Sequence, residues 1–296
     1  MPSPRIRVLG LPGYGQNAAY LDAKLRRAQE IWAEDIELVC MEPPHVLSVP
    51  TLPNTGSSSV PSPTSPSHAE SSDPATPAGV TQNARYYWQW ANHRHFAGGE
   101  IETLLAYCRA FLEKHGPFDA CLGFSQGSAT AVLLLALLER PDLHPIWSAP
   151  SSDPSVDWPP APFKCGVLFS AFGPGDKRYQ KWYEQKKPLT PTLHIIGRND
   201  VVANPQHSLD TFERFSTQTR KICWHDGGHH IPRKPYFAHL VKDFILSSID
   251  DARSDLDDER RDGWGSPAES VAGSIGEGTG SHPARPLSPV AAEAKI

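Results

Sequence analysis

The chain has 296 residues and a net charge of −5, and its Lys and Arg residues form no basic block, which argues against nucleic acid or an anionic membrane as a main partner. Its most apolar run, residues 129–138, is about ten residues long, far short of the roughly 20 that a membrane-spanning helix needs. The N-terminus lacks the apolar core of a signal peptide, so we expect a cytoplasmic protein.

Two segments have compositions that do not support a folded core. Residues 51–84 are mostly Ser, Pro and Thr, and residues 250–296 are charged and then rich in Gly, Ser and Pro. Neither can bury enough apolar surface to offset the entropy of ordering, so we predict that both are disordered. The remaining residues, about 215, suit a single domain over residues 1–249, with 51–84 as an insertion and a loop at 141–162.

The N-terminal part predicts a strand–helix–strand unit. Residues 6–9 form a short apolar strand that runs into the Gly-containing loop 11–17. Asn17 can cap a helix whose apolar positions recur as far as Trp32, and residues 36–40 form a second strand. Two closely spaced strands with a helix between them indicate a parallel pair.

Four aromatic residues fall within residues 86–90, after the predicted insertion. A helix follows Gly99 and ends at His115, where Gly116 takes the cap position before a proline. Residues 118–122 then form another apolar strand, which leads into a tight turn and an apolar helix.

The C-terminal half continues the alternation of strands and helices. Strands are predicted at 165–170, 192–196 and 220–225, with a helix that opens at Asn204-Pro205 and a closing helix that reaches Ile245. This alternation predicts an α/β fold with a mostly parallel sheet and helices on both faces. In such sheets ligands bind beyond the carboxyl ends of the strands, where four chemically suggestive stretches of this chain occur.

The turn after the 118–122 strand reads Gly-Phe-Ser-Gln-Gly over residues 123–127. Between a strand and a helix, this pattern is that of a nucleophile elbow. Gly123 and Gly127 stand where a Cβ would collide with neighbouring backbone. The turn lifts the Ser125 hydroxyl to the strand tip and aims the backbone N–H of Gln126 at a developing oxyanion.

Ser125, Asp200 and His229 follow one another in the order expected of the acid–base machinery of such a fold. A serine hydroxyl needs a base to take its proton, and a His with an ordinary pKa of about 6.5 suits that role. A carboxylate on the far imidazole nitrogen fixes the tautomer and stabilises the imidazolium. Each of the three residues follows a predicted strand.

Other residues compete for these roles. Ser125 could simply cap a helix, and Asp200 could be a turn residue. His225 and His230 flank His229, but only His229 follows a Gly-Gly hinge directly. Asp226 lies too close to the histidines in sequence to orient them easily, and Asp176 falls in an irregular stretch.

The loop after the first strand can supply a second oxyanion donor, the backbone N–H of Tyr14, or it can be an ordinary Gly-rich turn. Tyr86, Tyr87, Trp88 and Phe172 could form the wall of an acyl pocket, or the aromatic run could simply pack under the insertion.

The five cysteines fall on predicted strands or on a helix face, without a C-x-x-C pair. We expect buried free thiols in a reducing compartment. These cysteines are Cys40, Cys108, Cys121, Cys165 and Cys223.

The motifs LPGYGQNA, GFSQGSA, FSAF, HIIGRND and GGHHIP together resemble the fungal serine hydrolase (FSH) family of α/β-hydrolases. The resemblance covers residues 6–45 and 85–245 and implies an α/β-hydrolase fold. It also implies Ser125, Asp200 and His229 as catalytic residues, with oxyanion donors at Tyr14 and Gln126. The family's first turn usually reads Leu-His-Gly, whereas this chain has Pro12 in place of the His.

The residues and the resemblance together predict a serine esterase or thioesterase that forms an acyl-enzyme on Ser125. We expect no metal and no cofactor, and a small-molecule ester or thioester substrate with a medium or long acyl chain or a polyketide-type acyl group. A general short-chain carboxylesterase is the main alternative. A non-catalytic hydrolase-fold binding protein is a second alternative, which the presence of all three catalytic residue types disfavours.

Overall fold

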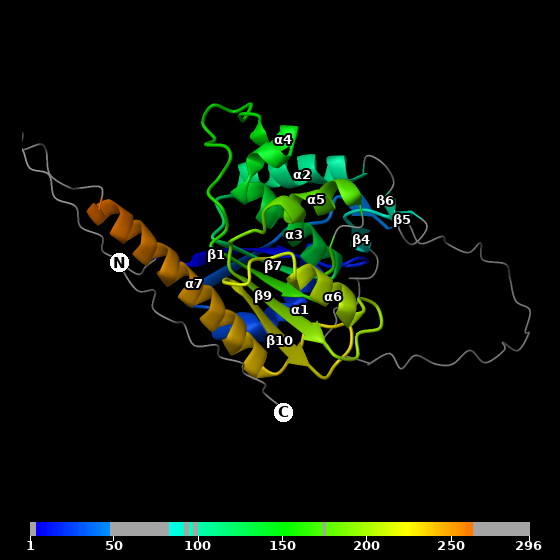
Figure 1. The fold of residues 1–296 in the computed structure, drawn as a ribbon. Helices are drawn as coiled ribbons and strands as arrows, with labels where there is room; N and C mark the ends of the chain where they lie inside the picture. Colours follow the sequence, from blue (N-terminus) through cyan, green and yellow to red (C-terminus); the bar gives the residue numbers. More distant parts are fainter. Residues whose placement is uncertain (1–3, 48–82, 92–94, 97–99, 174–175, 263–296) are drawn as a thin grey trace, which may run out of the picture. The chain divides into compact units, whose positions relative to one another are not determined.

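The computed structural model describes residues 4–47, 83–91, 95–96, 100–173 and 176–262 (Figure 1). Nearly all of the predicted insertion and most of the predicted tail therefore lie outside the described residues. The chain divides into two compact units, Met1–Leu256 and Asp257–Ile296, and the first contains the whole sheet.

The core of the first unit is a sheet of six strands in the order β10-β9-β8-β7-β1-β2. Every neighbouring pair in it is parallel, which confirms the predicted α/β class. The strands are β1 (Ile6–Leu11), β2 (Ile36–Cys40), β7 (Ala120–Phe124), β8 (Cys165–Phe169), β9 (Thr192–Gly197) and β10 (Arg220–His225).

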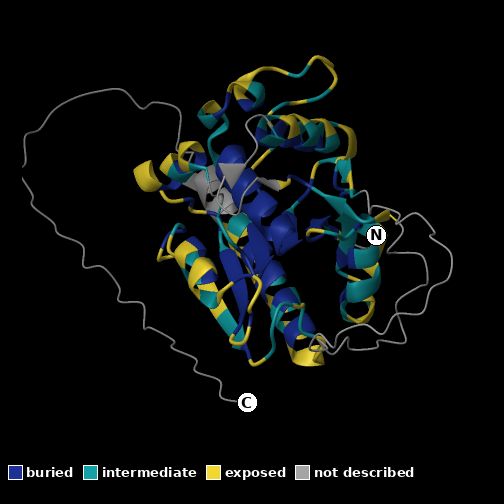
Figure 2. Cartoon of the chain, turned by 90° about the vertical axis from the view of Figure 1, so that its right-hand side faces the viewer, coloured by how far each residue is buried: buried dark blue, intermediate teal, exposed yellow. Residues whose placement is uncertain are grey.

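Helices cover both faces of this sheet, as the all-apolar central strands require (Figure 1). One hydrophobic cluster joins the sheet to α2, α3 and α5, and the other joins it to α1 and α7. Residues 126–138 of α3 are all buried, whereas other helices expose one side (Figure 2). The helices are α1 (Ala18–Trp32), α2 (Glu100–His115), α3 (Gln126–Glu139), α4 (Pro145–Ser148), α5 (Lys177–Gln185), α6 (Pro205–Phe212) and α7 (Pro235–Asp262).

The strand order reverses between β1 and β7. From β1 the chain moves outward to β2, and from β7 it moves in the opposite direction through β8, β9 and β10. The loops that leave β1 and β7 therefore begin at the switch point of the sheet, at its carboxyl edge, which is the usual place for a ligand in such folds.

A short antiparallel ladder brackets the predicted insertion. His45 of β3 (His45–Val46) pairs with Tyr86 of β4 (Arg85–Tyr86), and the Leu47 N–H donates to the Ala84 carbonyl at 2.7 Å. The two ends of the insertion thus leave the fold side by side. A second ladder joins β5 (Trp90–Ala91) to β6 (His95–Phe96).

Three elements differ from the sequence-based expectation. Helix α5 was not predicted, although Tyr179, Trp182 and Tyr183 recur at helical spacing and are buried. The 141–162 loop contains two short helical turns, a 3-10 turn at Pro141–Leu143 and α4. The closing helix continues to Asp262, beyond the boundary predicted at residue 249.

All five cysteines are free, but only three are buried. Cys40 and Cys223 are partly exposed, which corrects the expectation that all five would be buried. Burial raises the pKa of the Cys165 thiol to about 12. Among the described residues, no helix is long and apolar enough to cross a membrane.

Candidate active site

Ser125 lies at the sharp turn between β7 and α3. Its φ of 54° and ψ of −118° are unusual for a residue with a side chain. A Cβ on Gly127 would come within 2.0 Å of the Leu11 carbonyl oxygen, and one on Gly123 within 2.6 Å of Ser128 backbone atoms. The glycines therefore permit the turn, as the sequence predicted.

The Ser125 hydroxyl contacts the candidate base. Its oxygen lies 2.9 Å from Nε2 of His229, and the side chain makes no capping bond to α3. The capping alternative therefore does not describe this serine. On the other side of the ring, His229 Nδ1 lies 2.8 Å from Asp200 Oδ2.

Asp200 sits in the loop that follows β9, with a side chain that is only 1% exposed. The Val202 and Ala203 backbone N–H groups both donate to its Oδ1, which leaves Oδ2 for His229. Burial alone would raise the pKa of Asp200, but the hydrogen bond to His229 and the contacts with Ser170 and Ala203 lower it below its usual range. The carboxylate is thus stabilised in its charged form.

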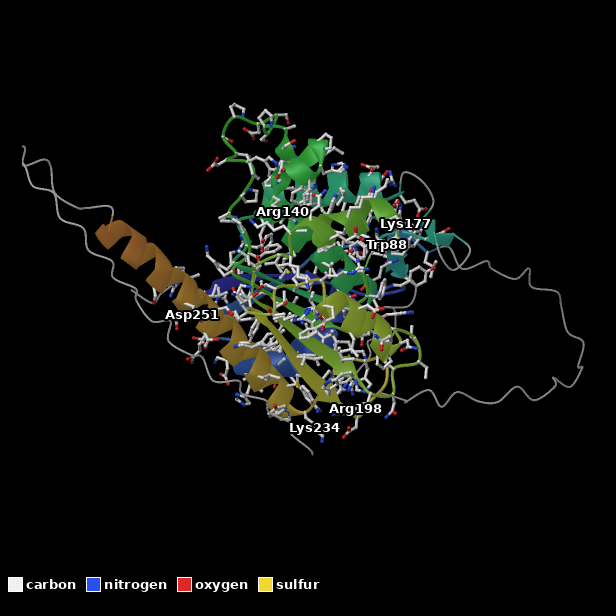
Figure 3. All side chains as sticks on the ribbon, in the orientation of Figure 1. Trp88, Arg140, Lys177, Arg198, Lys234 and Asp251 are labelled. Atoms are coloured by element: carbon white, nitrogen blue, oxygen red, sulfur yellow. The ribbon has the colours of Figure 1, made fainter. Side chains whose placement is uncertain are left out.

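The loop after β10 carries His229 and packs directly on the loop after β9. The Asn199 N–H donates to the Gly227 carbonyl and the Arg198 N–H to the His225 carbonyl. The ring of His229 lies 4.9 Å from that of Phe124, which limits its orientation. Arg198 and Lys234 mark the edge of the sheet where these loops lie (Figure 3).

The competing residues have other partners. His225 Nδ1 accepts the Gly227 N–H, and its ring lies 5.1 Å from that of His230. Burial and the nearby His230 lower the pKa of His225. Asp226 is exposed and pairs with Arg198, and Asp176 caps α5.

The loop after β1 lies against the start of α3. The same close approach of Leu11 to Gly127 places Gly13 beside Phe124, the residue before the nucleophile candidate. The Gly13 N–H donates to Gln16 Oε1 at 2.9 Å, which fixes the turn that presents Tyr14. As the first residue of α3, Gln126 has a backbone N–H without an acceptor inside the helix.

The four predicted pocket aromatics are divided between the core and its edge. Tyr87 and Trp88 are fully buried in the cluster with α2 and α3, on the side where Figure 3 labels Trp88. Tyr86 is partly exposed and lies against the rings of Tyr14 and His45. Phe172 packs at the edge of the same cluster. Their role in an acyl pocket stays a prediction.

Two features of the site were not predicted. The Ser170 hydroxyl helps to lower the Asp200 pKa, although its geometry is outside that of an ordinary hydrogen bond. The backbone of Ser170 has a positive φ of 48°. The Gln126 side chain also bonds to the 86–90 aromatic run. From the sequence, only the backbone N–H of Gln126 was expected to act at the site.

Within the described ranges, no three His, Cys, Asp or Glu residues group as metal ligands would.

Comparisons with known proteins give a family match and several similar proteins. The sequence model of a family described as serine hydrolase (FSH1) matches residues 1–241. Esterase OVCA2 of Danio rerio is 24% identical over 83% of this chain and 98% of that protein. An uncharacterized hydrolase of Schizosaccharomyces pombe is 26% identical over 81% of this chain, but the match covers only 50% of that protein.

A solved structure of esterase PE8 superposes with a TM-score of 0.51 and 17% identity, over 83% of this chain and 93% of that one. Together with the parallel sheet, this likeness confirms the predicted α/β-hydrolase fold.

Proposed function

The chain belongs to the serine hydrolase (FSH1) family, and from that premise we propose that it hydrolyses carboxylic esters or thioesters through an acyl-enzyme on Ser125. The observation that carries this proposal is the continuous hydrogen-bonded line from Ser125 Oγ through His229 to Asp200, with distances of 2.9 and 2.8 Å.

In the first half of the reaction, Ser125 Oγ attacks the substrate carbonyl carbon while His229 Nε2 takes its proton. Asp200 accepts the Nδ1–H bond, which keeps Nε2 available and stabilises the imidazolium. The tetrahedral oxyanion is held by the backbone N–H groups of Gln126 and Tyr14. His229 then returns the proton to the leaving alcohol or thiol, and the acyl-enzyme remains.

In the second half, a water molecule replaces the leaving group. His229 takes a proton from the water as it attacks the acyl carbon, and the same donors hold the second oxyanion. When that intermediate collapses, His229 gives the proton to Ser125 Oγ and the carboxylic acid leaves.

We propose a medium or long acyl chain for the substrate, because Tyr87 and Trp88 belong to a cluster of bulky apolar side chains that includes α3, the helix that follows Ser125. A polyketide-type acyl group is the narrower form of this proposal and rests on family resemblance alone. A series of p-nitrophenyl esters of increasing chain length, run beside matched thioesters, tests both points. A maximum at the shortest esters would favour the short-chain carboxylesterase instead.

A fluorophosphonate probe tests the chemistry directly. We expect it to label the native protein and to lose that labelling in Ser125→Ala. The matched control is Ser128→Ala, since Ser128 is a buried serine on the same helix whose hydroxyl donates to the Phe169 carbonyl. A folded native protein that never labels would show that the fold has been kept for binding alone.

A further inference from the structure

The Gln126 side chain has a function separate from that of its backbone. It is completely buried, and its Oε1 accepts the Tyr87 N–H at 2.9 Å. Its Nε2 donates to the Trp88 carbonyl at 2.8 Å. One side chain at the start of α3 therefore bonds to two consecutive residues that are far away in sequence.

An amide of this length satisfies both partners. Tyr87 offers a donor and Trp88 an acceptor, so the side chain between them must accept at one atom and donate at the other. Glu would accept without donating when ionised, Met would do neither, and Asn is one methylene shorter. A bond lost here would leave a buried backbone group without a partner, which is unfavourable because that group has also lost its hydrogen bonds to water.

The same stretch of chain also reaches the loop after β1. We call residues 83–88 the bridging segment. The Gly15 N–H donates to the Arg85 carbonyl at 2.8 Å, and Asn17 Nδ2 donates to the Asn83 carbonyl at 3.3 Å. The ring of Tyr86 lies 5.8 Å from that of Tyr14.

An ion pair attaches the bridging segment to the end of β2. The guanidinium of Arg85 lies 2.6 Å from Glu42 Oε1 and donates to the Pro43 carbonyl. Glu42 Oε2 in turn accepts the Ala18 N–H at the start of α1. The bridging segment is thus held at the loop after β1, at the residues that follow β2 and at the elbow.

We propose that the Gln126 side chain is a positioning residue: by fixing the bridging segment, it sets the distance between the two oxyanion donors, the N–H groups of Tyr14 and Gln126. This inference rests on the proposed hydrolase function. Gln126 links the bridging segment to one donor, and Arg85 and Tyr86 link it to the loop that carries the other. A change at either end moves one donor relative to the other.

The test compares Gln126→Met and Gln126→Glu with the native protein. Both keep the backbone N–H, Met loses both side-chain bonds, and the buried Glu carboxyl, which is favoured in its neutral form, can still donate to Trp88 and accept from Tyr87. We expect kcat to fall about tenfold to a hundredfold in Gln126→Met, with KM changed less than about twofold, because a misplaced donor weakens the transition state alone. Gln126→Glu should lie between Met and the native protein.

The matched control is Thr130→Val, which removes a buried side-chain bond from the same helix, that from Thr130 Oγ1 to the Gln126 carbonyl, and leaves both side-chain bonds of Gln126 in place. Hydrogen exchange by mass spectrometry gives a second readout. The Tyr87 amide should exchange slowly in the native protein and in Thr130→Val, and faster in Gln126→Met.

The outcomes separate the two proposals. If the native protein hydrolyses no ester, the proposed function fails. The exchange of the Tyr87 amide still tests whether the Gln126 side chain fixes the bridging segment. If the native protein is active and Gln126→Met keeps its kcat, or if Thr130→Val loses as much, the positioning role is wrong. A native Tyr87 amide that exchanges as fast as an exposed loop would overturn it even if neither Gln126 variant folds.

Discussion

Asp200 holds a charge where water is almost excluded, and only its hydrogen bonds make that charge favourable. Two backbone N–H groups donate to Oδ1, so the carboxylate is oriented by its own loop, independently of His229. This arrangement explains why an aspartate is needed at the position: an amide would have to present an N–H to backbone donors or to the ring.

Asp200→Asn is expected to lower kcat by about three to four orders of magnitude, because the imidazolium loses its counter-charge and the ring its tautomer. Steady-state kinetics on a p-nitrophenyl ester measure the loss. Asp226→Asn is the control, since Asp226 is exposed and pairs only with Arg198 among the contacts that the structure defines. Equal losses in both variants would contradict the assignment of the acid.

The same substitution should change the acid dependence of stability. The pKa of Asp200 is lowered by folding, so its charged form contributes stability that is complete above the unfolded value of about 3.9 and is lost as the pH falls through the folded value. Denaturant unfolding should therefore show that the free energy of unfolding of the native protein exceeds that of Asp200→Asn at neutral pH, and that this difference disappears below about pH 4. A difference in the free energy of unfolding that persists at lower pH would contradict the stabilising role of the Asp200 charge.

At the residue scale, the sequence predicted those residues whose role follows from their own chemical type. Ser125, Asp200 and His229 each follow a strand, and a nucleophile, an acid and a base are recognisable one by one. The role of the Gln126 side chain was not predictable, because its partners are backbone groups of Tyr87 and Trp88, which lie 39 and 38 residues away in the chain. Ser170 was missed because a serine at a strand end has many ordinary roles.

At the scale of the elements, the site depends on how closely two loops approach. A Cβ on Gly197, the last residue of β9, would come within 2.6 Å of the Gly228 carbonyl oxygen and 2.7 Å of that of Gly227. These carbonyls belong to the loop that carries His229. The bare backbone of Gly197 is what lets the acid loop and the base loop pack together.

Gly197→Ala is therefore expected to displace the His229 loop and to lower kcat by about tenfold to a hundredfold. The control is Gly166→Ala on β8, where a new Cβ would meet mainly the movable methyl groups of Leu135. The unfolding temperature and kcat of both variants are measured together, which separates a displaced His229 loop from a general loss of stability. If the two variants lose activity in proportion to stability, the close approach has no special role at the site.

Most elements were predictable because their periodicity is strong. The central strands are continuous apolar runs, and helix α2 repeats its apolar residues on one face. Helix α5 was missed because it is short and follows a Gly-Pro stretch that reads as loop. The β3–β4 ladder was missed because two residues per strand show no periodicity at all.

At the scale of the whole molecule, backbone pairing holds the two ends of the predicted insertion together. The β3–β4 ladder and the bond from Leu47 to Ala84 join its two ends. The described contacts also correct where the dispensable part stops, since Asn83 and Ala84 both take part in hydrogen bonds of the folded domain.

Replacing residues 49–81 with a short Gly/Ser linker should leave activity on a small p-nitrophenyl ester within about twofold of the native value. A second deletion that also removes residues 83–88 should abolish activity, because it takes the bridging segment with it. The assay compares kcat and unfolding temperature for both. Collapse of the fold in the first variant would show that the insertion is part of the core.

The pairing of β3 with β4 also means that the chain consists of two complementary pieces joined by residues 48–82. The first piece carries β1 and Tyr14, and the second carries Ser125, Asp200 and His229. Because β1 lies between β2 and β7 in the sheet, the first piece docks into the second through backbone hydrogen bonds. A chain cut between residues 48 and 82 would therefore have to reassociate through β1 and β7 before it could turn over a substrate.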